Sequence, residues 1–429
     1  MSVNKPMNTK SPDRIAARHD LTKSTMRLAA FAALLALSLD ARAQDVIMPA
    51  PSFSVTPPAV QEIQADNQMI VFTPETAVPP AQPFQYGIFN LRPHPYYRFL
   101  YGAGILAGTN QAVNTVINQI SPGFLLEIGR HWTLDYTPTW TFYSNGHFKD
   151  SLDHSITLTG GTSYEDWTLG LSQNVSLTSD PMVETATQTD QQSYTTDVKA
   201  SYLINSKLFT DLGLNQHIIS ADQFNSSREW STLDWLNYQF WPRMSAGVGV
   251  GFGYVNVETG PDMTYEQLQA RTDWRATDKI SFQVHAGGED RQFLSGASDL
   301  LNFVFGATIQ YQPFTVTKIS ISANRGVSPS YFTGATEDTD LTAGLNQRLL
   351  GKLYLDLQGS YRKVKYVTSE SNLPVNRDDD IYSVSVQLSY RFIERGSVAA
   401  FYQAGKDSSS QPGFGYSSSQ VGFQISYSF

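Results

Sequence analysis

From about residue 96 to its end, the chain repeats one pattern, in which apolar and polar side chains alternate over short segments. A period of two is typical of a β-strand with one apolar and one polar face. In the segment 381–393, for example, Val384, Val386 and Leu388 alternate with Ser and Gln. The pattern predicts eighteen strands, at residues 96–106, 118–128, 132–144, 151–163, 167–179, 192–204, 207–220, 228–240, 244–258, 264–276, 280–292, 300–312, 315–327, 338–349, 353–366, 381–393, 397–407 and 419–429.

The breaks between these segments alternate in length. Very short breaks, such as 165–166 and 205–206, follow longer ones, such as 145–150 and 180–191. In an up-and-down meander, alternate connections lie on opposite rims, and outer-membrane barrels have short periplasmic turns and longer external loops. We therefore expect an all-β fold: a transmembrane, up-and-down, antiparallel β-barrel of about 18 strands, with 16–18 as the range. A soluble sandwich shares the alternation, but so many hairpin-linked strands would make an unusually wide open sheet.

The last segment runs to the end of the chain and stops on an aromatic residue, whereas chain ends are usually frayed and polar. We expect it to close the barrel by pairing with the strand near residues 96–106. Its apolar face is expected to contact lipid and to act as a signal for outer-membrane assembly. These residues are Val421, Phe423, Ile425, Tyr427 and Phe429.

Composition agrees with many half-buried strands. Aromatic residues make up 12% of the chain, although its mean hydropathy is slightly negative at −0.27. The chain has no cysteine, which excludes disulfides, thiolate metal sites and a cysteine nucleophile. Aromatics near expected strand ends, including Trp132 and Trp241, indicate a girdle at the lipid–water boundary, although ordinary β-propensity is an alternative explanation.

Residues 1–43 have the features of an export signal with a long N-terminal extension. Arg27 precedes an apolar run over 28–39, and Ala41 and Ala43 have the spacing of a cleavage site. The run is too short to span a bilayer as a helix, and no other segment reaches that length. We expect cleavage near Ala43–Gln44 and a location in the outer membrane. Translation from Met1 or from Met26 remains open, and an uncleaved anchor or a buried helix is the alternative.

Residues 44–94 form a Pro-rich segment between the signal and the barrel, which we place at 95–429. Repeated prolines disfavour both helices and central strands, so an extended or disordered periplasmic segment is expected. Its more aromatic end, residues 84–90, is a candidate for docking on the barrel mouth. The sequence leaves open whether the segment plugs the lumen.

The polar face of the expected strands carries many charges, which need partners or water when they are buried. Eighteen strands also enclose a cylinder too wide for side chains to fill. A hydrated lumen is therefore expected. Its charged lining candidates are Arg271, Arg275, Arg291, Lys318, Arg325, Arg348, Arg362, Arg391, Asp135, Asp197, Asp211, Asp273, Glu289, Asp340 and Asp356.

The basic candidates lie toward the C-terminal half of the barrel, in the tenth to sixteenth expected strands. Opposed basic and acidic walls would set a transverse field that selects solutes by charge. The alternative is cross-strand neutralisation without a preference for any solute.

Signatures of catalysis are weak. His154 and Ser155 are adjacent on a strand, so they point to opposite faces and cannot form a dyad. The histidines form no metal-ligand cluster, and the acidic run 378–380 is expected to be a solvated external loop. We expect no enzyme activity, no catalytic residue, no metal and no cofactor. The net charge of −9 argues against a nucleic-acid partner.

The segment from Asn90 to Gly102 and the Phe-terminated last strand resemble bacterial outer-membrane β-barrel proteins, and more narrowly the putative β-barrel porin 2 group. The resemblance covers about residues 84–429. It implies an outer-membrane location, a pore-like role, and contact with outer-membrane lipid and with the barrel assembly machinery. It transfers no site residues, because no motif can be matched position by position. No expected external loop is long enough to be an obvious constriction loop, unlike in general trimeric porins.

Three functions follow in order of expectation. The first is a porin-like channel for passive diffusion of small hydrophilic solutes. The second is a conduit or accessory barrel in exopolysaccharide export, for which a lumenal Tyr/Trp track would be the sign; Tyr143 and Trp235 are too few to indicate one. The third is a structural outer-membrane protein without transport.

Overall fold

The computed structural model describes residues 84–106, 112–179, 181–182, 187–222, 224–294, 299–330, 334–367 and 377–428. The chain divides into two compact units, Met1–Asp45 and Val46–Phe429, and every described residue belongs to the second. The described part contains strands and no helix, hence no helix long and apolar enough to cross a membrane. The expected export signal and most of the Pro-rich segment lie outside the described residues.

The strands are β1 (Phe84–Tyr86), β2 (Phe89–Leu106), β3 (Ala112–Ile128), β4 (Trp132–Tyr143), β5 (Ser151–Tyr164), β6 (Trp167–Thr178), β7 (Pro181–Met182), β8 (Thr187–Gln188), β9 (Gln191–Leu203), β10 (Leu208–Ala221), β11 (Ser227–Trp241), β12 (Met244–Val257), β13 (Met263–Trp274), β14 (Ile280–Phe293), β15 (Leu300–Phe314), β16 (Thr317–Pro329), β17 (Ala335–Leu350), β18 (Leu353–Val367), β19 (Asp378–Arg391), β20 (Gly396–Ser409) and β21 (Tyr416–Tyr427).

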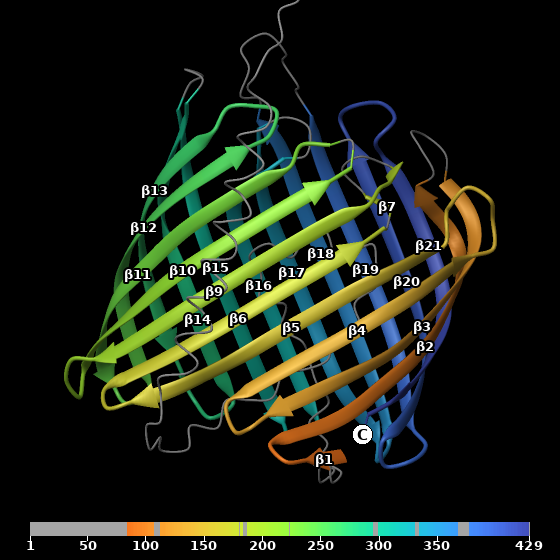
Figure 1. Ribbon diagram of the computed structural model, residues 1–429, viewed down its shortest axis with the longest axis horizontal. Coiled ribbons are helices and arrows are strands. Elements are labelled where there is room, and N and C mark those ends of the chain that lie inside the picture. The colour runs from red at the N-terminus through yellow and green to blue at the C-terminus, as the bar shows by residue number, and fades with distance from the viewer. Residues whose placement is uncertain are drawn as a thin grey trace, which may run out of the picture. The chain divides into compact units, whose positions relative to one another are not determined.

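Eighteen of these strands form a closed antiparallel barrel. Strands β2–β6 and β9–β21 each pair with their neighbours along the chain, and β21 pairs back to β2, as in the pairs Tyr97–Ile425 and Tyr101–Val421. In Figure 1 the orange β2 accordingly lies beside the blue C-terminal strands. The short β1 adds to the edge of β2, and β7 and β8 form a separate two-stranded ladder. The prediction of an eighteen-strand up-and-down barrel is confirmed, because each expected segment overlaps one barrel strand.

The two rims of the barrel differ as the sequence predicted. Connections such as 165–166 and 242–243 lie on one rim, which we call the short-turn rim. Connections such as 144–150 and 410–415 lie on the other, the long-loop rim. Several tight turns use left-handed backbone, with φ of 63° at Gly129, 46° at Gly351 and 51° at Glu165.

Strand β2 begins at Phe89, earlier than the expected strand, and contains Pro93 and Pro95. Its ladder with β3 runs along this part, whereas its ladder with β21 begins only at Tyr96. The two prolines therefore lie where β2 has no barrel neighbour on its β21 side, so no ladder bond to β21 needs their missing N–H.

The closing strand β21 has the two faces that its sequence predicts. Val421, Phe423 and Ile425 are 53%, 38% and 44% exposed on the outer face, whereas Gln420 is 8% exposed on the inner face. Phe423 also stacks on Phe99 of β2, with ring centroids 5.3 Å apart. The seam that closes the barrel is thus covered outside by apolar side chains.

Phe429 lies outside the described residues, so its role as an assembly signal stays a prediction. We expect Phe429→Ala to lower the amount of folded protein in the outer membrane, because the terminal aromatic would no longer be available to the assembly machinery. The measurement is the heat-modifiable band on gels of outer-membrane fractions. Normal levels of that band would contradict the role.

The wall does not close edge to edge between β15 and β16 at the long-loop rim. Their ladder ends at the pair Phe305–Arg325, although β15 extends back to Leu300 and β16 continues to Pro329. Beyond that pair, no ladder joins the two strands among the described residues.

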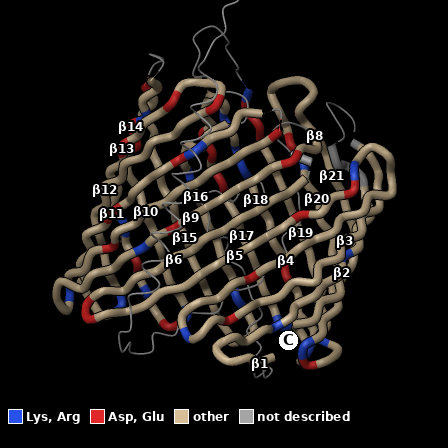
Figure 2. The backbone as a smooth tube through the Cα atoms, in the orientation of Figure 1, with Lys and Arg blue, Asp and Glu red and all other residues tan. Residues whose placement is uncertain are grey.

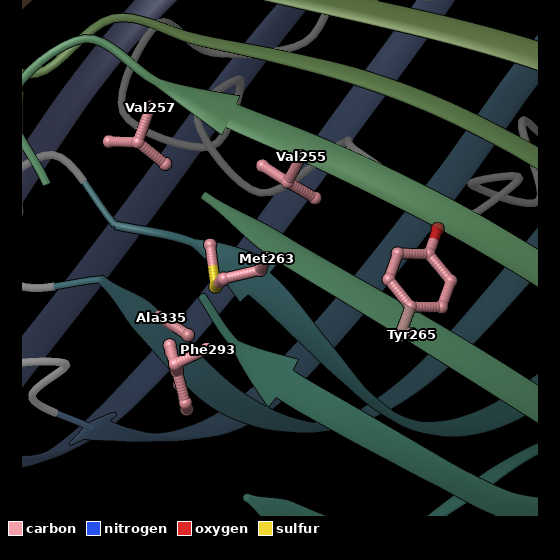
Figure 3. Packing of buried hydrophobic residues seen from close by; sticks show 6 residues of the cluster. All are labelled: Val255, Val257, Met263, Tyr265, Phe293 and Ala335. Carbon is pink, nitrogen blue, oxygen red and sulfur yellow. The ribbon is translucent and has the colours of Figure 1, made fainter. Parts of the chain in front are cut away.

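Apolar side chains connect the two sides there instead. Val255, Met263 and Phe293, from the inner face of β12–β14, form a buried cluster with Ala335 of β17 (Figure 3). Ala335 lies six positions from Leu341, which is 47% exposed on the outer face, so Ala335 belongs to the outer face of its strand. The inner face of β12–β15 therefore packs against the outer face of β16–β18. We call this region the overlap; it comprises Val255, Val257, Met263, Tyr265, Phe293 and Ala335, with Leu300, Val327 and Val367 packed against them.

Candidate functional site on the inner face of the barrel

The strand registers place most of the predicted lining residues on the inner face. Each of them lies opposite another inner-face residue on a neighbouring strand, and most alternate with outward apolar residues on their own strand. Carboxylates and basic groups from nine different strands thus share this face. The residues are Asp135, Asp197, Asp211, Arg271, Asp273, Glu289, Arg291, Lys318, Asp340, Arg348, Asp356, Arg362 and Arg391.

Two predicted lining residues lie elsewhere. Arg275 follows the last residue of β13 and is exposed in the turn at the short-turn rim. Arg325 shares its face with Ile321, which is 43% exposed on the outside, and its Nη2 lies 3.1 Å from Glu337 Oε2. A charged residue was expected to face inward, but Arg325 lies at the overlap, where the outer face also carries charges.

A glycine stripe on β12 lets side chains of its neighbours lie flat on the inner wall. A Cβ at Gly253 would lie 2.1 Å from the Tyr265 ring, and one at Gly249 would lie 2.7 Å from the Trp235 ring. A Cβ at Gly247 would lie 2.3 Å from Asn237 Oδ1. The glycines thus make room for side chains from β11 and β13 to meet across β12.

Arg271 uses this room to join three strands. Its Nε donates a 2.9 Å hydrogen bond to Asn237 Oδ1 on β11, and its guanidinium pairs with Asp211 on β10. The guanidinium also lies over the Trp235 ring, 4.5 Å from its centroid. Asn237 in turn donates to the same Asp211 carboxylate at 3.0 Å. These side chains form a charge-balanced network near the short-turn rim.

A second network lies nearer the long-loop rim. Tyr265 donates its hydroxyl proton to Glu229, and the Arg291 guanidinium lies 4.6 Å from the centre of the Tyr265 ring. Arg291 Nε lies 2.8 Å from Glu289 Oε1, and Gln267 donates to the other Glu289 oxygen at 2.6 Å. Arg291 and Glu289 are 1% and 2% exposed, so this pair is fully buried.

Strands β17 and β18 carry further ion pairs. Arg362 of β18 lies 3.2 Å from Asp338 and 3.5 Å from Asp340, both on β17. At the long-loop rim, Arg377 binds Asp379 through two nitrogens at 2.5–3.0 Å and stacks on the Tyr366 and Phe414 rings.

The sequence analysis missed several charged inner-face residues on β2. Arg92 pairs with Glu127 at 3.1 Å and His94 with Asp135 at 3.2 Å, but both lie in the range assigned to the Pro-rich segment. Arg98 is 3% exposed and stacks on the Phe401 ring at 4.4 Å. Because Arg98 lies between the outward residues Tyr97 and Phe99, the alternation of this strand would have identified it as an inner-face residue.

These pairs bear on the expected transverse field. Arg271, Arg291 and Arg362 each have a carboxylate partner on the same strand or within three strands. Their charges are thus compensated locally, which favours cross-strand neutralisation over opposed walls. Both kinds of charge occur at both rims (Figure 2), but in the described residues the short turns carry more basic than acidic residues and the long loops more acidic than basic ones. The basic turn residues are Arg130, Lys207, Arg243, Arg275, Lys279, Lys352 and Arg395, and the acidic loop residues are Asp150, Asp190, Asp222, Glu258, Asp262 and Asp299.

Among the described histidines, His217 lies near a hydroxyl group, with its Nε2 3.4 Å from Ser193 Oγ, whereas the adjacent pair His154 and Ser155 does not come together. His154 lies on the outer face of β5, where its Nδ1 is 2.9 Å from the Tyr136 hydroxyl, and Ser155 lies on the opposite face. The run 378–380, expected to be an external loop, forms the start of β19. No group of three or more His, Cys, Asp or Glu in the described residues is arranged to hold a metal ion.

Comparison with known proteins finds similarity of structure only. No family model matches the chain, and no curated protein matches it. Among solved structures, Pseudomonas aeruginosa OccK2 (OpdF) and the outer membrane protein OpdK of the same organism each match with a TM-score of 0.44 and 10% identity, over 79% of this chain and 98% of theirs. OpdO of Pseudomonas aeruginosa matches with a TM-score of 0.44 and 13% identity, over 79% of this chain and 97% of its own. Such weak similarity carries no functional argument, so function must be argued from the barrel itself.

Proposed function

We propose that this protein is an outer-membrane channel through which small hydrophilic solutes diffuse passively. One observation carries the proposal: a closed barrel that is apolar outside and charged inside. The outer face exposes large apolar side chains on nearly every strand of the barrel wall, as at Leu236, Val248 and Leu268. Such a surface is stable in lipid, and the ladder that runs from β2 round to β21 pairs the strand edges along most of the wall, with β15 and β16 left unpaired to each other at their long-loop ends.

An inner face with this many ionised groups needs water, because burying charges in a dry core would cost several kcal/mol each. Ion pairs hold many of these side chains against the wall. A hydrated path along the axis, with the long loops outside the cell and the short turns in the periplasm, follows from that arrangement. Lipid and the barrel assembly machinery are the partners that this location implies.

Export of a polysaccharide has less support. Sugar-binding tracks need aromatic faces open to the lumen, but arginines stack on the inner-face rings. The centroid distances are 4.5 Å for Arg271 on Trp235, 4.4 Å for Arg98 on Phe401 and 5.7 Å for Arg391 on Tyr354. The covered rings leave little aromatic surface for sugar rings.

The channel should prefer cations weakly, because carboxylates outnumber basic groups on the described inner face. The acidic residues there are Glu127, Asp135, Asp153, Asp197, Asp211, Glu229, Asp273, Glu289, Asp338, Asp340, Asp356, Asp379 and Asp407, and the basic ones are Arg92, Arg98, Lys199, Arg271, Arg291, Lys318, Arg348, Arg362, Arg377 and Arg391.

Reconstitution in planar bilayers tests both statements. We expect stepwise conductance, and in a KCl gradient a zero-current potential with the sign of cation preference. Asp273→Asn should reduce that preference, since Asp273 is an exposed inner-face carboxylate. Glu266→Gln, on the exposed outer face of the same strand, is the matched control and should leave it unchanged. Absence of conductance steps from heat-modifiable, folded protein would contradict the channel and favour a structural role.

A further inference from the structure

The overlap is a part of the barrel wall that no backbone ladder holds shut. Elsewhere on this seam, β15 and β16 are joined by paired residues from Phe305–Arg325 to Phe314–Thr317. Beyond the pair Phe305–Arg325, toward the long-loop rim, the described residues 300–304 of β15 do not pair with residues 326–329 of β16. Side-chain packing takes the place of the ladder there. Moving the two sides apart would therefore break apolar contacts and the 3.4 Å hydrogen bond from Arg291 Nη2 to the Val327 backbone oxygen, but no inter-strand ladder bond. Wall segments with few backbone bonds open most readily.

The lining of the overlap is apolar, as is a smaller inner-face cluster of Leu100, Ile117 and Phe401 on other strands. Val255, Met263 and Phe293 are 0%, 0% and 5% exposed, and they point inward from strands whose inner faces otherwise carry mainly glycine or polar residues. Outside the same seam, Leu301 and Phe303 are 81% and 59% exposed. Filling an opening between such apolar surfaces with water would be unfavourable, whereas filling it with a hydrocarbon chain would not.

Two buried hydrogen-bond donors at the base of the overlap have no partner among the described residues. They are Arg291 Nη1 and Asn302 Nδ2, on side chains that are 1% and 6% exposed. The two residues lie on neighbouring strands, since Arg291 pairs with Leu300 and Asn302 with Glu289. A buried polar group without a partner costs free energy until an acceptor reaches it.

The charge around these donors selects the kind of acceptor. Glu289 already neutralises Arg291 at 2.8 Å, and Glu229 lies nearby as the acceptor of the Tyr265 hydroxyl. A second anion would be repelled by these carboxylates. A neutral carbonyl oxygen can accept from Arg291 Nη1 and Asn302 Nδ2 without that repulsion.

We propose that the overlap is a lateral binding site for a fatty acyl ester. Its ester carbonyl accepts hydrogen bonds from Arg291 and Asn302, and its chain lies among Val255, Met263 and Phe293. The chain enters from the bilayer between β15 and β16, where it separates the packed faces of the overlap. This lateral route is distinct from the axial path of hydrophilic solutes.

The test uses the full-length protein in phosphatidylcholine vesicles that contain a monoacylglycerol with a diazirine in its acyl chain. After illumination, mass spectrometry locates the labelled residues. We expect label on Met263 or Phe293, which a lipid on the outer surface cannot reach. Label confined to outward residues such as Leu301 and Phe303 would overturn the proposal.

The variant Asn302→Leu removes one donor while keeping the side-chain size. We expect about fivefold to tenfold less label on Met263 and Phe293, as the loss of one hydrogen bond implies. Asn324→Leu, an inner-face asparagine in the paired part of β16, should leave that label unchanged. Undiminished label in folded Asn302→Leu would refute the assignment of the ester group. Conductance of the same samples tests the channel separately, so failure of one proposal is distinguishable from failure of the other.

Discussion

Replacing Arg291 with methionine should lower the free energy of unfolding by about 3–5 kcal/mol, because it leaves the Glu289 carboxylate buried without its counter-charge. Both side chains are at most 2% exposed, and their closest atoms are 2.8 Å apart. Gln267 still donates to Glu289 at 2.6 Å, but one neutral hydrogen bond compensates little of the cost of a buried charge. The measurement is urea unfolding of the protein in lipid vesicles, followed by tryptophan fluorescence and by the heat-modifiable band.

A second variant separates loss of charge from loss of packing. Arg291→Met combined with Glu289→Gln should recover most of the stability, because no ionised group is then left buried alone. Arg243→Met is the control: its partner is Asp278 at 2.8 Å, with side chains 53% and 83% exposed, so we expect a loss of about 1 kcal/mol or less. Equal losses of stability from Arg291→Met and Arg243→Met would contradict the claim that burial of the Arg291–Glu289 pair makes it the more important of the two.

Gly422→Val should prevent most of the protein from closing into a barrel. A Cβ at this position would lie 2.1 Å from the backbone oxygen of Phe99 and 2.6 Å from the Phe401 ring. Phe99 belongs to β2, so the clash falls on the seam that joins the last strand to the first. Because a backbone atom cannot swing aside as a side-chain tip can, the seam itself must separate. Overpacking of even a tolerant core typically costs 1–3 kcal/mol.

The matched control is Gly359→Val in β18. A Cβ there meets its nearest neighbour, the backbone oxygen of Ser383, only at 3.9 Å, which is ordinary contact. We expect heat-modifiable protein near the unmodified level for Gly359→Val and a strong reduction for Gly422→Val. Equal yields from the two variants would show that the β2–β21 seam tolerates the extra side chain.

Much of the fold could be predicted because the pleat of a strand is a local property. Side-chain alternation and turn residues predicted all eighteen barrel strands and the difference between the rims. The same alternation predicted the inward direction of residues such as Asp211 and Arg362. It did not predict that β2 begins at Phe89, since Pro93 and Pro95 argue against a strand unless one edge lacks a neighbour.

The contacts of the inner wall could not be predicted in this way. Arg271 meets Asp211, which lies sixty positions earlier in the chain and three strands away. That contact depends on the registers of three ladders and on the room that Gly247 and Gly249 leave between them. A pattern read along one strand contains none of these relations. Arg325 was misplaced for a different reason: it lies four positions from outward Ile321 and seven from inward Lys318, so the alternation itself puts it on the outer face of β16.

The alternation along the chain was enough to predict the number of strands, their two faces and the apolar closing strand, because each depends on a period of two within a short stretch of chain. The tertiary structure alone decided which charges are paired and where the ladder between β15 and β16 stops. It also decided that Ala335, on an outer face, packs with the inner-face residues Met263 and Phe293. The physical reason is that register and overlap arise between strands, from the fit of side chains that lie far apart in the chain.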